Sequence, residues 1–327
     1  MPWTSPWWLP GGHAQTVVAA KLSRRYAHTR PTWQRTRWTT PDDDFVDVDW
    51  LHTSAPDNAP LLVLFHGLEG SSQSHYAQAF AHVAQQRGWR LALPHFRGCS
   101  GELNRAPRAY HSGDWHEIDW LLAQCQAQHR GPMCAAGVSL GGNALMRWAG
   151  EMGTRARERV CAVASICSPL DLVSSGMALG RGLNRYLYTP MFLQTMKPKA
   201  RRKWQQHPGL FDLAAVERAK TLWDFDDAFT APVHGFAGVL DYWTRASAKP
   251  TMRQIAVPAL ALNARNDPFV PAASLPTEDD VSASVTLWQP EQGGHVGFAQ
   301  GAWPGQVWGM PEQVITWLQQ HVEVRHG

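Results

Sequence analysis

The first half of the chain alternates short apolar runs with segments in which apolar residues recur every three or four positions. Such a run between turn-forming residues is typical of a strand buried on both faces, and the wider spacing is typical of an amphipathic helix. At residues 45–50 apolar and acidic positions alternate instead, as in a half-buried strand. The predicted strands here are residues 45–50, 61–65, 89–93, 133–138 and 160–166, and helices are predicted after Ser74, after Ser112 as a cap, and after the strand at 133–138.

This order of elements predicts a mostly parallel sheet with helices on its faces. Crossovers between parallel strands are right-handed, so they place the carboxyl ends of the strands at one edge of the sheet. Ligand sites in such sheets lie at that edge. We therefore expect functional residues directly after the strands.

The alternation stops after Pro169 and resumes near Pro258. Residues 170–252 show helical patterns and many large apolar side chains but no convincing strand. Residues 258–263 and 283–288 then predict two more strands, and residues 311–322 predict a last helix. We predict a single domain over residues 1–327, with residues 170–252 inserted as a helical cap above the sheet edge. A cap rich in apolar side chains predicts a roofed, mostly apolar pocket.

Composition excludes several classes of protein. Of the 327 residues, 44% are hydrophobic and 17% are charged, which excludes a disordered chain. The net charge of +3 is too small to predict nucleic-acid binding. His116-Glu117 begins the zinc motif H-E-x-x-H, but Trp120 replaces the second histidine. No phosphate-binding glycine loop occurs either, so we predict neither a metal nor another cofactor.

The cysteines and the amino-terminal residues favour a reducing compartment. Five cysteines are an odd number, and none forms a C-x-x-C pair. The first residues lack an early lysine or arginine and are broken by Pro2, Pro6 and Pro10, so they do not resemble a signal peptide. No stretch approaches the ~18 apolar residues of a membrane span. We predict a cytoplasmic protein without a transmembrane segment.

The strongest chemical signal is Gly137-Val138-Ser139-Leu140-Gly141, which fits G-x-S-x-G between a predicted strand and a predicted helix. The turn in this motif is crowded, so only small residues fit around the serine, whose hydroxyl is lifted clear of the sheet edge. Ser139 is therefore the candidate nucleophile. The alternative is an ordinary strand–helix turn, and a serine needs a neighbouring base to react.

Two residues that follow strands are candidates to activate Ser139. His295 stands among glycines after the last predicted strand and is the candidate base. Asp267 follows the strand at 258–263, and it would fix the imidazole tautomer and stabilise the imidazolium. An ordinary loop residue is the alternative for each.

A reacting serine also needs N–H groups that hold the negative oxygen of the attacked carbonyl. One candidate is the N–H of Leu140, next to Ser139. The other is the N–H of Leu68, in the loop at residues 66–70 that follows the strand at 61–65. We predict that Leu68 and Leu140 form an oxyanion hole, with a plain glycine turn as the alternative for the loop.

Together these residues resemble the α/β-hydrolase superfamily, in which the serine, the acid and the histidine follow in this order. Within it the chain is similar to the YheT-like family of serine esterases over nearly its whole length. The closer likeness lies in residues 6–9 with 12–16, 66–72 with 74–76, 95–101, and 266–271 with 295–298. Asn266 departs from the family, where a second aspartate is usual, and residues 170–252 match weakly.

The resemblance implies an α/β-hydrolase fold, whose mostly parallel sheet has eight strands. It also implies Ser139 as nucleophile, Asp267 as acid and His295 as base. Relatives act on acyl esters, including medium-chain fatty esters and phospholipids, as hydrolases or acyltransferases. Ester hydrolysis through an acyl-enzyme is thus the leading prediction, and acyl transfer to an alcohol would use the same groups. A non-catalytic binding protein on this scaffold is a third hypothesis, and the intact set of three residues argues against it. The sequence does not indicate an oligomeric state.

Two features of the sequence each allow two interpretations. The basic run at residues 197–203 (KPKARRK) is either a solvated face or a surface attracted to anionic lipids, which would bring the protein to a membrane surface. The tryptophans Trp3, Trp7 and Trp8 either fill the core or form part of an acyl-binding wall.

Overall fold

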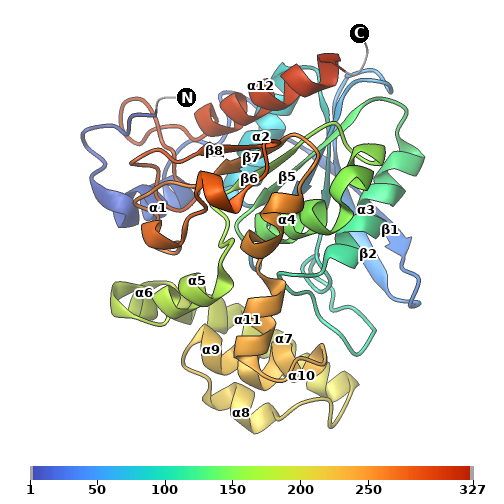
Figure 1. The fold of residues 1–327 in the computed structure, drawn as a ribbon, viewed down its shortest axis with the longest axis vertical. Helices are drawn as coiled ribbons and strands as arrows, with labels where there is room; N and C mark the ends of the chain where they lie inside the picture. Colours follow the sequence, from blue (N-terminus) through green and yellow to red (C-terminus); the bar gives the residue numbers. More distant parts are fainter. Residues whose placement is uncertain (1–2, 325–327) are drawn as a thin grey trace.

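The structure, a computed structural model, describes residues 3–324. Within this range one sheet carries helices on both faces, and a separate group of helices lies below it (Figure 1). The strands are β1 (Trp33–Thr39), β2 (Phe45–Leu51), β3 (Leu61–Phe65), β4 (Arg90–Pro94), β5 (Met133–Val138), β6 (Val163–Ile166), β7 (Ala259–Leu262) and β8 (Val285–Trp288). The helices are α1 (Gly11–Lys21), α2 (His75–Gln86), α3 (Trp115–Gln128), α4 (Leu140–Met152), α5 (Leu172–Leu179), α6 (Gly182–Leu187), α7 (Thr189–Gln206), α8 (Leu213–Arg218), α9 (Leu222–Phe225), α10 (Ala231–Val233), α11 (Val239–Ala246) and α12 (Gly309–Val324).

The sheet has eight strands in the order β1-β2-β4-β3-β5-β6-β7-β8. Strand β2 runs antiparallel to both of its neighbours, and every pair from β4 to β8 is parallel. This confirms the predicted mostly parallel, eight-stranded sheet. Strand β1 was not predicted, because it is a largely solvent-facing edge strand without an apolar run.

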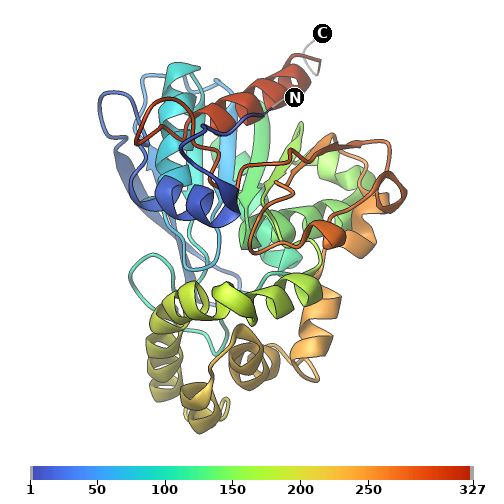
Figure 2. The same ribbon diagram turned by 90° about the vertical axis from the view of Figure 1, so that its left-hand side faces the viewer.

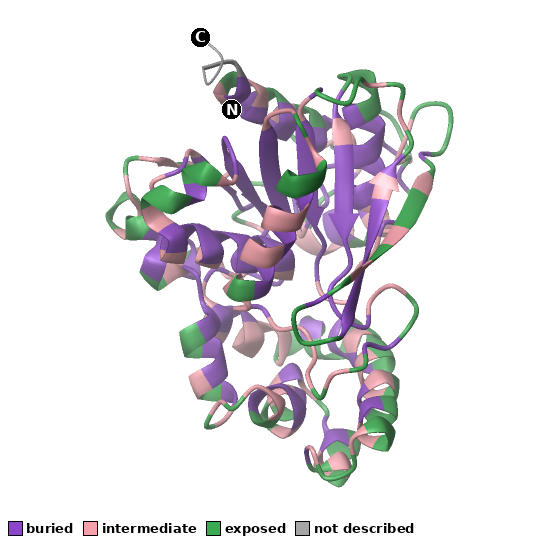
Figure 3. Ribbon diagram, turned by 90° about the vertical axis from the view of Figure 1, so that its right-hand side faces the viewer, coloured by how far each residue is buried: buried purple, intermediate pink, exposed green. Residues whose placement is uncertain are grey.

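Side chains of the central strands point alternately to two apolar layers. Leu62 and Leu64 pack with α2 and α12 on one face. Leu61, Val63 and Phe65 pack with α3 and α4 on the other. All five residues of β3 are therefore buried, as expected for a central strand of a parallel sheet. Figure 3 shows the inner strands as buried over most of their length.

Helices α5 to α11 form the separate group below the sheet, between β6 and β7 in sequence (Figures 1 and 2). They share an apolar core of their own, which includes Phe211, Phe229 and Trp243. Within residues 170–252 the structure contains helices and turns and no strand, as the sequence predicts.

One helix prediction needs correction, and one helix was not predicted. Ser112 does not cap α3: the cap is Asp114, whose carboxylate accepts the N–H of Glu117 at 3.3 Å. The Ser112 hydroxyl instead accepts a hydrogen bond from Asn143 of α4 at 2.9 Å. Helix α1 was not predicted, because its apolar residues are spread around the helix instead of lying on one face.

The five cysteines lie in the described part of the chain, and no disulfide joins them there. Four of them are buried, and Cys99 is partly buried. Among residues 3–324 no helix is both long and apolar enough to cross a lipid bilayer.

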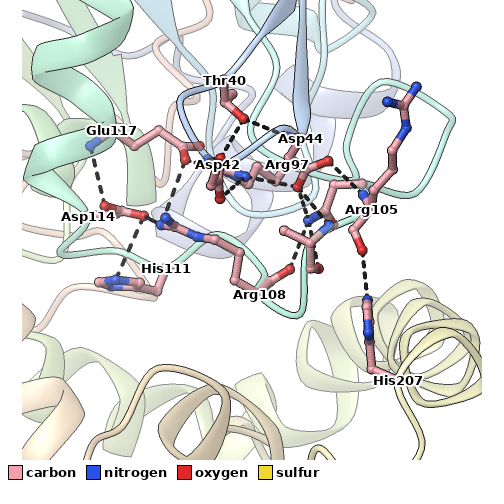
Figure 4. A network of polar contacts seen from close by, with 12 residues as sticks. Thr40, Asp42, Asp44, Arg97, Arg105, Arg108, His111, Asp114, Glu117 and His207 are labelled. Atoms are coloured by element: carbon pink, nitrogen blue, oxygen red, sulfur yellow. Dashed lines mark hydrogen bonds and ion pairs between the residues drawn. The ribbon is translucent and has the colours of Figure 1, made fainter.

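A buried polar network fixes the loop between β4 and α3, and Asp44 is at its centre (Figure 4). The Asp44 carboxylate accepts hydrogen bonds from Arg97 at 2.9 Å and Asn104 at 2.7 Å, and from the N–H of Arg105 at 2.6 Å. Burial alone would raise the pKa of Asp44, but the hydrogen bonds from Asn104 and from backbone N–H groups, that of Arg105 among them, lower it to about 2. Asp44 therefore stays ionised, and it ties the β1–β2 turn to the β4–α3 loop.

Arg97 extends the network to the start of α3. Its guanidinium also binds Asp42 at 2.9 Å and Glu117 at 2.6 Å. Its side chain is buried, so the guanidinium is balanced by carboxylates instead of water.

We expect Asp44→Asn to lower the free energy of unfolding at pH 7 by ~2–4 kcal/mol, since it removes one member of a buried charge network. The folded-state pKa of Asp44 lies below the ordinary 3.8, so its contribution is present above about pH 4 and is lost as the pH falls toward 2. The stability difference between wild type and variant should therefore shrink below pH 4.

Urea unfolding at several pH values between 2 and 7 measures this difference. Asp43→Asn is the control, because Asp43 is the exposed neighbour in the same turn. A wild-type–variant difference that stays constant from pH 7 to pH 2 would contradict the assignment.

Candidate active site

Ser139 lies in a sharp turn between β5 and α4. Its backbone has φ 53° and ψ −120°, a conformation that non-glycine residues adopt rarely. The chain around it is very close-packed: a Cβ on Gly137 would lie 2.4 Å from the carbonyl oxygen of Gly141, and one on Gly142 would lie 1.9 Å from Oγ of Ser168. The crowded turn predicted from G-x-S-x-G is confirmed.

The structure brings the three predicted side chains together. Nε2 of His295 is 3.0 Å from Oγ of Ser139, and Nδ1 of His295 is 2.8 Å from Oδ2 of Asp267. An ionised carboxylate only accepts hydrogen bonds, so Nδ1 carries the proton that it donates to Asp267. Nε2 is then free to accept the hydroxyl proton of Ser139.

The Asp267 side chain is fully buried and held from its other side. Its Oδ1 accepts the N–H of Phe269 at 2.7 Å and the N–H of Val270 at 3.3 Å. These bonds fix the carboxylate in the plane where it meets His295.

Helix α1 supports the His295 loop from outside the sheet. The Thr16 hydroxyl accepts the N–H of His295 at 2.9 Å, and Oε1 of Gln15 accepts the N–H of Gly293 at 2.9 Å. The Asn266 amide donates to Gln15 at 2.9 Å and accepts the N–H of Gly294 at 3.0 Å. An aspartate at position 266 could not donate to Gln15, which gives a reason for the asparagine.

No motif or hydrophobic pattern in the sequence marks Gln15 and Thr16 as part of the site. The one signal for them was the likeness of residues 12–16 to the YheT-like family, which assigned them no role.

Aromatic rings cover one side of His295. The ring of Phe269 stacks on the imidazole at 4.1 Å between centroids, and Tyr188 contacts Phe269 edge-on at 4.5 Å. His13 stacks on Tyr188, and its Nδ1 is 3.2 Å from the Tyr188 hydroxyl. The helical group thereby contributes Tyr188 to the surroundings of the base.

In the loop after β3 the N–H groups on either side of Leu68 have acceptors, and that of Leu68 has none among the described residues. Gly67 donates to the Tyr76 hydroxyl at 2.9 Å, Glu69 donates to the Tyr110 hydroxyl at 3.1 Å, and Gly70 donates to the carbonyl of Gly67 at 2.9 Å. Within the described chain no acceptor takes the N–H of Leu68. The same holds for Leu140, the first residue of α4, as expected for the first turn of a helix. Both leucines border the cavity that contains Ser139.

Two hollows meet at Ser139. The cap-side cavity lies between the sheet edge and the helical group, and about 1090 Å³ of space inside it, mouth included, is free of protein atoms. Its walls are mainly apolar and include Leu68, Leu172, Phe192, Met196 and Phe229. The α1-side groove is more open, and its walls include Thr16, Lys21, Arg25, His75 and His295.

The amino-terminal tryptophans do not border either hollow, so the acyl-wall interpretation is wrong for them. Trp3 packs edge-on against Phe298, and Trp8 packs against Trp303. Trp7 is 93% exposed and therefore does not fill the core either.

The basic run at residues 197–203 lies within α7, and its side chains point in different directions. Arg201 and Arg202 are exposed, in keeping with a solvated face. Lys203 is buried and donates to the carbonyls of Asn104 and Ala106 at 2.7 and 2.9 Å, and Lys199 is turned toward the sheet. For these two lysines the solvated-face interpretation is wrong.

No cluster of three or more histidine, cysteine, aspartate or glutamate side chains in residues 3–324 is arranged to hold a metal ion.

The strand order, the turn at Ser139 and the Ser139–His295–Asp267 contacts are those of an α/β hydrolase. The family model described as "alpha/beta hydrolase fold" matches residues 60–302. The protein YheT of Escherichia coli (strain K12), which is named as an esterase, is 36% identical to this chain over 318 residues. These residues make up 96% of this chain and 92% of that protein. The chain therefore belongs to the alpha/beta hydrolase family and, within it, to the YheT-like proteins.

Two further comparisons agree with this family. Phospholipase ABHD3 of Mus musculus is 28% identical over 295 residues, which cover 88% of this chain and 71% of that protein. Among solved structures, an esterase of Pyrococcus furiosus superposes with a TM-score of 0.54 at 14% identity, covering 92% of this chain and 96% of that one. At this identity the structural likeness shows the fold alone.

The crowding at the turn predicts that an added methyl group destabilises the protein at Gly137 but not at an uncrowded glycine. Gly137→Ala should lower the free energy of unfolding by ~1–3 kcal/mol, because the new Cβ has no space and the backbone must move. Gly180→Ala is the matched control: its φ is −78° and its nearest neighbouring atom would lie 3.6 Å away. Urea unfolding of both variants measures the contrast, and equal stability of the two would contradict the geometry.

Proposed function

We propose that the chain is a serine hydrolase of carboxylic esters that works through an acyl-enzyme. The observation that carries the proposal is the pair of hydrogen bonds that links Ser139, His295 and Asp267 at the mouth of the cap-side cavity. A serine hydroxyl gains nucleophilic strength when a base removes its proton as it attacks. His295 is within reach to do so, and Asp267 favours the imidazolium that results.

The proposed reaction has two halves. Ser139 Oγ attacks the ester carbonyl, His295 takes the serine proton, and the N–H groups of Leu68 and Leu140 hold the negative oxygen. The carbon–oxygen bond to the alcohol then breaks, and His295 gives the proton to the leaving alcohol. In the second half a water molecule gives a proton to His295 as its oxygen attacks the acyl-serine. The bond between the acyl carbon and Ser139 Oγ then breaks, His295 returns the proton to Oγ, and the acid is released.

The two hollows suggest how an ester is oriented. We interpret residues 170–252 as a cap on a single domain, and we assign the acyl chain to the cap-side cavity because its walls are mainly apolar. The alcohol part then lies in the α1-side groove, which is more open and more polar. The relatives named esterase and phospholipase support esters, including lipids, as substrates.

We expect Ser139→Ala to lower kcat by about 10⁴-fold or more, since it removes the nucleophile. Asp267→Asn should lower kcat by about 10⁴-fold, because an amide holds the wrong imidazole tautomer. Asp224→Asn is the control, because Asp224 is exposed and caps α9. Turnover of a p-nitrophenyl ester gives kcat, and circular dichroism confirms the fold.

A fluorophosphonate probe gives an independent test of the nucleophile. It should label the wild type and Asp224→Asn but not Ser139→Ala. A wild type that remains unlabelled would favour a non-catalytic binding protein, and a folded, active Ser139→Ala would contradict the assignment of the nucleophile.

The apolar cavity predicts a preference for acyl length. Each buried methylene contributes ~0.8 kcal/mol, before the cost of ordering the chain. kcat/KM for p-nitrophenyl esters should therefore rise from acetyl to an acyl chain of about six to ten carbons and fall beyond it, where the cavity ends. If acetate or propionate were the best ester, the acyl chain would not occupy this cavity, although Ser139 could still be the nucleophile.

A further inference from the structure

Lys199 reaches from α7 to the loop beside Ser139. Its Nζ lies 2.9 Å from Oε1 and 2.8 Å from Oε2 of Glu69, and 3.6 Å from Sγ of Cys99. Glu69 directly follows Leu68, whose N–H is proposed to hold the oxyanion. One ion pair thus joins the helical group to the loop that carries this donor.

Glu69 is held at both its backbone and its side chain. The Tyr110 hydroxyl accepts the N–H of Glu69 at 3.1 Å and donates to its carboxylate at 2.8 Å. The φ of Glu69 is +57°, a left-handed conformation that is unfavourable for a non-glycine residue and persists only where the surroundings enforce it. The shape of the loop therefore depends on the contacts that Glu69 makes.

The face of α7 that carries Lys199 also borders the cap-side cavity. Phe192, Met196, Lys199 and Lys203 follow one another at helical spacing, and all four contribute to the cavity wall. An acyl chain in this cavity would pack against Phe192, two turns before Lys199, and Met196, one turn before it. A longer chain would contact more of this face and hold α7 more firmly.

We propose that Lys199 and Glu69 are positioning residues that couple acyl binding beneath α7 to the Leu68 N–H. This inference rests on the proposed function. A chain that fills the cavity holds α7 in place, the ion pair holds the loop, and the N–H then meets the negative oxygen of the transition state. Acyl length should accordingly raise kcat and not only lower KM, because the gain appears in the transition state.

Substitutions can remove the ion pair while most of each side chain is kept. The Lys199 side chain is 31% exposed and that of Glu69 is 9% exposed, so the stability of each variant is measured beside its rate. Lys199→Met keeps the length of the side chain without its charge, and Glu69→Gln keeps an oxygen for Tyr110. Lys199→Arg keeps the ion pair. Lys197→Met is the matched control, because Lys197 is on the same helix but donates to the carbonyl of Glu217.

The experiment measures kcat and KM separately for p-nitrophenyl acetate and octanoate. In the wild type kcat should be higher for octanoate. Lys199→Met and Glu69→Gln should lower kcat for octanoate by about tenfold, less than the 10²–10³ for losing a donor outright. Their kcat for acetate should change much less, and their KM values should stay close to those of the wild type. Lys199→Arg should restore most of the rate, and Lys197→Met should behave as the wild type.

Several results would overturn this inference: unchanged kcat in both variants, a change in KM alone, or an equal loss of kcat for the two esters. Circular dichroism and urea unfolding check each variant, and Glu69→Gln carries the test if Lys199→Met does not fold. A wild type that hydrolyses neither ester would defeat the proposed function itself. An active wild type with unaffected variants would defeat only the coupling.

Discussion

The site depends on how closely the backbone of the turn after β5, which carries Ser139, approaches the backbone of the loop after β3. A Cβ on Gly141 would lie 2.5 Å from the carbonyl oxygen of His66, so the turn after β5 touches the loop after β3. Only a glycine at position 141 allows so close a contact. The two segments meet because β3 and β5 are parallel neighbours whose carboxyl ends lie at one edge of the sheet. The two predicted oxyanion donors, Leu68 and Leu140, border one cavity as a direct result.

Elements far apart in the sequence then hold this arrangement in place. Helix α1 binds the His295 loop through Thr16, while Asp44 orders the loop between β4 and α3 that carries Tyr110. Tyr110 in turn holds Glu69 beside the Leu68 N–H. The catalytic geometry is thus supported from both sides by polar contacts, whereas the apolar layers on the sheet faces supply the bulk of the burial.

Much of this was predictable because it depends on local patterns. Apolar runs mark the central strands, and Ser139, Asp267 and His295 each follow such a run, so the topology alone brings them to one edge. Strand β1 lacks this signal because it is an edge strand, and α1 lacks it because two of its buried residues, Gln15 and Thr16, are polar. The Ser112 hydroxyl was misassigned for a related reason: its partner, Asn143, is 31 residues away, and no local rule identifies that contact.

The basic run of α7 shows where prediction from sequence reaches its limit. The helical period separates its charges: Arg201 and Arg202 face water, whereas Lys199 and Lys203 share a face with Phe192 and Met196. Sequence spacing can reveal that face, but it cannot show that a carboxylate 130 positions away meets Lys199 there. A lysine buried among apolar residues without a partner would be costly. The helix can turn this face inward because Glu69 binds the ammonium group of Lys199, and the carbonyls of Asn104 and Ala106 accept hydrogen bonds from that of Lys203.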